Sequence, residues 1–61
     1  DVSFTDYLNG YRLTMAARML ASSSDSIANI AVETGFGNLS YFNRVFKRKY
    51  GCTPTEFRLK H

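Results

Sequence analysis

The sequence has very little cysteine, proline or tryptophan, and it contains no long hydrophobic run. Cys52 is the only cysteine among 61 residues, which excludes an internal disulfide and a cysteine-rich metal finger. No apolar stretch approaches the roughly 18 residues needed to cross a bilayer. We expect no secretory leader, because no basic segment followed by an apolar one is present. A cytoplasmic location is the resulting expectation.

The side chains that catalysis needs are also missing. His61 is the only histidine, and the chain has no Ser-His-Asp set, no phosphate-binding loop and no carboxylates paired by their spacing. A metal site built from His61 and Cys52 lacks further ligands. We therefore expect no enzymatic activity, no metal and no other cofactor.

Hydrophobic residues make up 44% of the chain, and four tyrosines and five phenylalanines are too many for a disordered tail. The charge is uneven. Residues 1–30 carry two arginines against three aspartates, whereas residues 31–61 carry six cations against two glutamates. Four of those cations fall within residues 44–49. Such a basic patch indicates an anionic partner, nucleic acid or a membrane surface, or else a solvated helix face.

Stretches with apolar residues at helical spacing predict an all-α fold. We expect helices over residues 4–21, 27–34, 39–50 and 54–60. The residues expected to cap them are Ser3, Asp25 or Ser26, Asn38 and Thr53. Gly35 and Gly51 are the expected stops, because glycine accepts the left-handed conformation that ends many helices.

Residues 39–50 have two distinct faces at 100° per residue. The apolar face consists of Phe42, Val45, Phe46 and Tyr50. The polar face consists of Ser40, Asn43, Arg44, Lys47 and Arg48. Lys49 falls towards the apolar side and must extend its ammonium to the edge. Because only Gly35 to Asn38 separate this helix from the preceding short one, the pair is typical of a helix-turn-helix.

The predicted helix over residues 4–21 has more apolar surface than so small a chain can cover. Leu13, Ala16, Ala17 and Leu20 form one stripe at helical spacing. A second apolar row lies off that stripe and consists of Tyr11, Met15 and Met19. We expect this second row to pack against a partner.

Residues 4–58 resemble the C-terminal part of an AraC/XylS-type DNA-binding domain. The matching residues are F-x-x-Y-L-x-x-x-R-L-x-x-A-x-x-x-L (4–20), S-I-x-x-I-A-x-x-x-G-F (26–36), N-x-S-Y-F-x-R-x-F-K (38–47) and Y-G-x-x-P-x-x-F-R (50–58). One departure is Asn29, where members of the family often carry an acidic residue that completes the helix cap.

The resemblance implies a homeodomain-like three-helix unit preceded by a long linking helix. Residues 1–24 would be the linking helix and connector. Residues 25–61 would be the second helix-turn-helix unit with its C-terminal supporting helix. The first helix-turn-helix unit, which packs on the linking helix in this family, and a regulatory domain would be absent. The implied function is the sequence-specific DNA-binding part of a bacterial transcriptional regulator, with a tilt towards activation.

The resemblance also implies that the helix over residues 39–50 enters the major groove of double-stranded DNA. Its predicted base contacts are Leu39, Ser40, Asn43 and Arg44. The predicted phosphate contacts are Ser26, Ile27, Tyr41, Lys47, Arg48, Lys49 and Arg58. Leu39 either contacts a thymine methyl or covers the helix end, and Tyr41 either flanks the core or contacts a phosphate.

The alternative function is a helical protein-interaction module that contacts RNA polymerase or a partner domain through its surplus apolar surface. A cationic amphipathic helix on a membrane surface is a third interpretation. The glycine turns and capped helices suit a compact fold better, so we expect no membrane partner.

Overall fold

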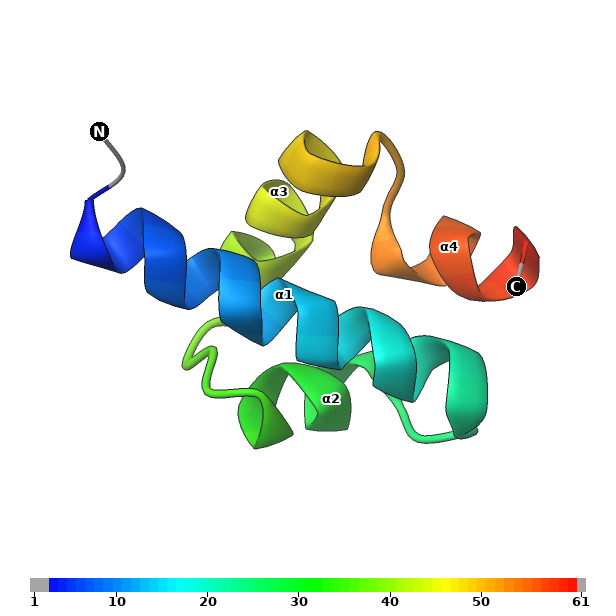
Figure 1. Ribbon diagram of the computed structural model, residues 1–61. Helices are drawn as coiled ribbons and strands as arrows, with labels where there is room; N and C mark the ends of the chain where they lie inside the picture. Colours follow the sequence, from blue (N-terminus) through cyan, green and yellow to red (C-terminus); the bar gives the residue numbers. More distant parts are fainter. Residues whose placement is uncertain (1–2, 61) are drawn as a thin grey trace.

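The computed structural model describes residues 3–60 and contains four helices (Figure 1). They are α1 (Phe4–Ser22), α2 (Ile27–Glu33), α3 (Leu39–Tyr50) and α4 (Pro54–Lys60). No strand occurs within this described range, and the all-α prediction is confirmed. α1 ends one residue later than predicted and α2 one residue earlier. Residues 1–2, which begin the predicted unit 1–24, and His61, which ends the predicted unit 25–61, lie outside the described residues.

The long helix α1 crosses the molecule, with α2 on one side of it and α3 and α4 on the other (Figure 1). α1 packs against α2 and α4, and α3 packs against the same two helices. The core is entirely apolar and draws on α1, α2, α3 and the turn between α2 and α3, with Phe57 of α4 packed against it. It consists of Leu13, Ala16, Leu20, Ile30, Ala31, Phe36, Phe42 and Phe46. None of the described helices is both long and apolar enough to span a membrane.

The first two helices begin at serine caps. The Ser3 hydroxyl accepts a hydrogen bond from the backbone N–H of Asp6 at 3.1 Å. Of the two caps considered for α2, Ser26 is the one used, and its hydroxyl accepts from the N–H of Asn29 at 3.1 Å. The Asn29 side-chain amide donates to the Asp25 carboxylate at 2.7 Å. The asparagine that departs from the family pattern is therefore hydrogen-bonded to the acid four residues before it.

The turn between α2 and α3 depends on Gly35, which has a φ of 95°. Only glycine adopts this left-handed conformation without steric cost. The next residue, Phe36, donates its N–H to the Ala31 carbonyl at 2.8 Å and stacks its ring 5.0 Å from that of Phe42. The Arg12 side chain covers the turn so closely that a Cβ on Gly35 would lie 2.9 Å from its Nε.

The last helix begins with a reciprocal cap. The Thr53 N–H donates to the Glu56 carboxylate at 2.9 Å, and the Glu56 N–H donates to the Thr53 hydroxyl at 3.2 Å. Hydrogen bonds from Thr53 lower the pKa of the exposed Glu56 carboxyl below its ordinary 4.5; the backbone N–H has the larger effect and the hydroxyl the smaller. Pro54 occupies the first helical position and is buried. This confirms the cap predicted for this helix.

Gly35→Ala should destabilise the fold by about 1–2 kcal/mol, because alanine is strained at positive φ. Gly37→Ala is the matched control, since Gly37 is not at positive φ and a Cβ there meets nothing within 4 Å. Urea denaturation of both variants measures the difference. Equal midpoints for the two alanine variants would show that the turn does not need its glycine.

The Glu56 cap should make stability depend on pH in the acid range. Because the folded pKa is lowered, the contribution is complete above the unfolded pKa and is lost as pH falls through the folded value. Melting temperatures of the wild type should therefore fall as pH decreases below about 4.5, and Glu56→Gln should remove part of that dependence. Glu33→Gln serves as the control. An acid limb that is the same in wild type and Glu56→Gln would contradict the role of this carboxylate.

Candidate nucleic-acid interface

Helix α3 separates its aromatic side chains from its polar ones. Phe42 and Phe46 have no exposed surface, and their ring centroids lie 5.7 Å apart. The polar residues Ser40, Arg44 and Lys47 lie at a spacing of three or four residues, which places them on one face of the helix. All three are exposed. The aromatic packing thus turns a polar face to the solvent.

The four predicted base contacts lie together on the first half of α3. Asn38 begins the helix by accepting the N–H of Tyr41 on its side-chain oxygen at 2.9 Å. Leu39 is 43% exposed, Ser40 and Arg44 are exposed, and Asn43 is half-buried. Within the described residues none of the four is fully buried, and Asn43 is the most covered of them. The arrangement offers hydroxyl, amide and guanidinium groups at one accessible surface.

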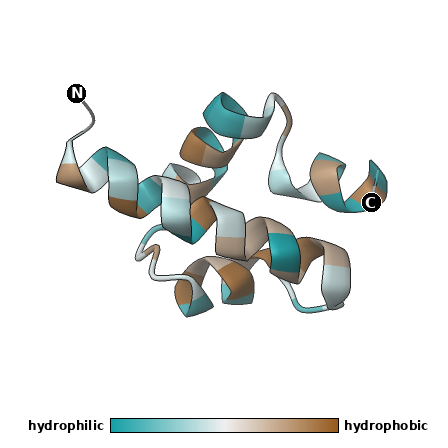
Figure 2. Ribbon diagram, in the orientation of Figure 1, coloured by the Kyte–Doolittle hydropathy of each residue, from teal (hydrophilic) through white to brown (hydrophobic). Residues whose placement is uncertain are grey.

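The second half of α3 adds positive charge to the same helix. Lys47, Arg48 and Lys49 form its last turn, which is the strongly hydrophilic end of α3 in Figure 2. Cations at a helix C-terminus are favoured by the macrodipole. Lys47 and Arg48 are exposed, so their charges remain accessible to an anionic partner.

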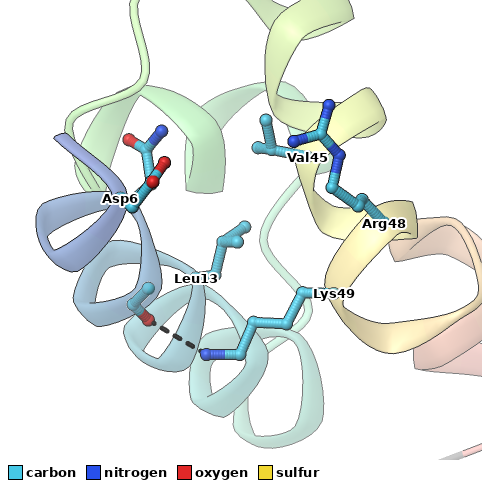
Figure 3. A pocket seen from close by; sticks show the side chains of 7 residues that line it. Asp6, Leu13, Val45, Arg48 and Lys49 are labelled. Atoms are coloured by element: carbon cyan, nitrogen blue, oxygen red, sulfur yellow. Dashed lines mark hydrogen bonds between the residues drawn. The ribbon is translucent and has the colours of Figure 1, made fainter. Parts of the chain in front are cut away.

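Lys49 is held differently, because it extends across an open groove between α3 and α1 (Figure 3). Its ammonium donates to the carbonyl oxygen of Gly10 at 3.4 Å and lies 5.7 Å from the centre of the Tyr50 ring. The groove has a volume of about 350 Å³ and is lined by Asp6, Asn9, Gly10, Leu13, Val45, Arg48 and Lys49. Lys49 was predicted to lie at the edge of the apolar face of its helix, and it does so because its side chain extends to the Gly10 carbonyl of α1.

Tyr41 flanks the core and bonds to α1. Its hydroxyl accepts a hydrogen bond from the side-chain amide of Asn9 at 2.7 Å, and its ring centroid lies 6.2 Å from that of Phe36. The guanidinium carbon of Arg44 sits 5.6 Å from the centre of the Tyr41 ring. Of the two roles considered for Tyr41, the packing role is present in the structure, and the phosphate contact stays a prediction.

Arg58 has a role inside the chain. Its guanidinium donates from Nε to the Leu20 carbonyl at 3.3 Å and from an Nη to the Ser23 carbonyl at 3.2 Å. The last carbonyls of a helix have no partner within the helix. Arg58 therefore caps the C-terminus of α1 from α4. Its predicted phosphate contact stays a prediction and would have to use its remaining N–H groups.

The residues predicted at the start of α2 are also engaged locally. The Ser26 hydroxyl caps the helix, and Ile27 is packed against the core. Asn9 and Gly10, which touch α3, were absent from the predicted site. No sequence signal finds them, because their partners Tyr41 and Lys49 are 32 and 39 residues away along the chain.

Two helices joined by a tight glycine turn, the second with an exposed polar face, define a helix-turn-helix, the class of domain that reads DNA with its second helix. A family model described as a helix-turn-helix domain matches residues 1–60. The chain belongs to this family, in its AraC-type branch.

Two relatives illustrate the family. The chain is 41% identical over 58 residues to the HTH-type transcriptional activator RhaR of Mannheimia succiniciproducens, covering 95% of this chain and 21% of that protein. It is 46% identical over 59 residues to the urease operon transcriptional activator of Escherichia coli, covering 97% of this chain and 20% of that protein. The chain thus spans about a fifth of the length of these relatives.

A solved structure is also similar. It is the C-terminal domain of the two-component response regulator yesN from Fusobacterium nucleatum, with a TM-score of 0.89 and 33% sequence identity. The match covers 93% of this chain and 55% of that one.

Arg58→Ala should lower the free energy of unfolding by about 1–2 kcal/mol, because it removes charge-assisted hydrogen bonds to the end of α1. The control is Lys60→Ala, at an exposed position of the same helix. Thermal melts followed by circular dichroism measure both. If Arg58→Ala melts like the wild type, the guanidinium does not stabilise the contact between α1 and α4.

Proposed function

We propose that this chain is the sequence-specific DNA-binding part of a bacterial transcriptional regulator, and that α3 is its recognition helix. The observation that carries the proposal is the outward polar face of α3, held in place by buried Phe42 and Phe46. A helix of this size fits the major groove of B-DNA, where each base pair presents a distinct pattern of donors and acceptors. The family membership supports the same function.

The first half of α3 would read base edges. Arg44 suits the two acceptors on the major-groove edge of guanine, and Asn43 suits the donor and acceptor of adenine. Ser40 pairs with either type of base, and Leu39 contacts a thymine methyl. A good bidentate contact contributes about 1–3 kcal/mol of discrimination against the wrong base.

The second half of α3 would contact phosphates, with Lys47 and Arg48 as the accessible cations. These contacts supply affinity without sequence information and make binding sensitive to salt. Lys49, Tyr41, Arg58, Ser26 and Ile27 complete the proposed phosphate-contacting set. The side-chain groups of Lys49, Tyr41, Arg58 and Ser26 already bond within the chain and would have to be shared with a phosphate.

We further propose that residues 1–24 are a linking helix and connector, and residues 25–61 a second helix-turn-helix unit. The support is an exposed apolar row on α1 that includes Phe4, Tyr7 and Tyr11, with exposed fractions of 76%, 69% and 61%. Of the row predicted from the sequence, Tyr11 and Met15 are exposed, whereas Met19 packs against the core. A first helix-turn-helix unit packed on the exposed row would cover it. The names of the relatives support an activator, with RNA polymerase as a further partner and the cytoplasm as its location.

Two matched variants of the intact protein test the assignment. Arg44→Ala should relax base preference at one or two positions of the DNA site by about 1–3 kcal/mol. Lys47→Ala should weaken binding to all sequences alike and reduce the log–log salt slope by about 0.9. The site is first selected from random DNA, and affinities are then measured by fluorescence anisotropy at several salt concentrations.

A base preference that Arg44→Ala leaves unaltered would refute its role in base contact. A salt slope that Lys47→Ala leaves unaltered would refute the phosphate contact. If the wild type enriches no sequence from random DNA, the proposed function itself is wrong.

A further inference from the structure

We propose that Asn9 and Tyr41 position the guanidinium of Arg44, so that the long helix α1 takes part in base selectivity without touching a base. This inference rests on the proposed function, because it concerns the side chain that would read guanine. Asn9 and Tyr41 are positioning residues in this account, and Arg44 is the group that contacts DNA.

The first step is that the Tyr41 ring is fixed from outside its own helix. Its hydroxyl receives the Asn9 side-chain N–H at 2.7 Å. Its ring packs against Phe36, with centroids 6.2 Å apart and planes at 47°. The hydrogen bond comes from α1 and the ring contact from the turn before α3. The tyrosine is therefore restrained at its tip and along its ring.

The second step is that Arg44 uses this ring as a platform. The two residues are three apart on α3, the spacing at which side chains on a helix meet. The guanidinium carbon lies 5.6 Å from the ring centre, within the roughly 6 Å over which a cation is attracted to an aromatic face. Arg44 is otherwise exposed, so the ring is the contact that limits its freedom.

The third step is that a restrained arginine discriminates better than a free one. Ordering a long side chain on binding costs entropy, and a side chain ordered beforehand loses less of it. A bidentate contact also needs the planar guanidinium to arrive in one orientation. A loose Arg44 would still contribute charge, but it would distinguish guanine less well from the other bases.

The same turn of α1 is tied to α3 a second time. Next to Asn9, the Gly10 carbonyl accepts the Lys49 ammonium at 3.4 Å. A Cβ at Gly10 would lie 3.8 Å from that nitrogen. These two hydrogen bonds join one turn of α1 to the first turn of α3, at Tyr41, and to its last turn, at Lys49. The position of α1 relative to α3 therefore determines where the Asn9 amide bonds the Tyr41 hydroxyl. It determines in this way the position of the ring beneath Arg44.

The test compares Asn9→Ala and Tyr41→Phe with the wild type, in the intact protein, by selection from random DNA and sequencing. Each variant should lower the base preference at the position read by Arg44 by about three- to tenfold, with preferences elsewhere unchanged. In an Arg44→Ala background neither variant should have a further effect. Thr5→Ala on α1 and Tyr50→Phe on α3 are the matched controls, because neither hydroxyl takes part in a hydrogen bond within the described residues 3–60.

A second readout needs no DNA. Relaxation of the Arg44 Nε–H group, followed by ¹⁵N NMR, should report greater mobility in Asn9→Ala than in the wild type. An unchanged mobility would overturn the positioning role. Melting temperatures of the variants show whether either change has unfolded the domain, and the conservative Tyr41→Phe keeps the aromatic ring but removes the hydroxyl that Asn9 restrains.

The remaining outcomes separate this inference from the proposed function. If Tyr41→Phe weakens binding to all sequences equally, Tyr41 contacts a phosphate and the inference is overturned. If the variants melt earlier but keep every base preference, the network is only structural and the inference is again overturned. If the wild type enriches no sequence, the proposed function fails, and the selectivity role fails with it.

Discussion

The packing of Phe42 and Phe46 determines which way the second helix of the helix-turn-helix faces. Both rings are fully buried, and they belong to a series of tilted and edge-on ring contacts that runs from Phe36 through Phe42 and Phe46 to Phe57. A domain of this size has a free energy of unfolding on the order of 3–9 kcal/mol. Truncating one buried phenylalanine costs about 3–5 kcal/mol, which is a large fraction of that free energy of unfolding. Each ring is therefore needed both for the fold and for the orientation that turns the polar face of α3 outward.

The long helix serves two purposes at once. Its buried stripe of Leu13, Ala16 and Leu20 completes the core, and its backbone carbonyls receive Lys49 near its middle and Arg58 at its end. These side chains come from α3 and α4. The orientation of α3, the proposed recognition helix, is therefore defined relative to α1, which connects the core to the polar surface proposed to meet DNA.

The local features of the fold could be predicted from the sequence, because caps and stops depend on residues three or four positions apart. Ser3, Asn38, Thr53 and the two left-handed glycines occupy their predicted roles. The ties between helices could not be predicted, since each joins residues more than 30 positions apart. Arg58 shows the difference: its charge suggested a phosphate contact, whereas the structure bonds it to the end of α1. The predicted base-contacting set was chosen from helical spacing and a family resemblance; its members lie together on the first half of α3, and their contact with bases stays a prediction.

In the proposed complex, α3 presents its polar face to DNA while its aromatic face stays in the core. The most direct measurement is a ¹H–¹⁵N NMR titration of the intact protein with DNA selected for tight binding, together with the ring signals of Phe42 and Phe46. We expect the largest changes at residues 39–48 of α3 and unchanged ring environments for the two phenylalanines. Changes centred on the exposed apolar row of α1, or a loss of the phenylalanine packing on binding, would contradict it.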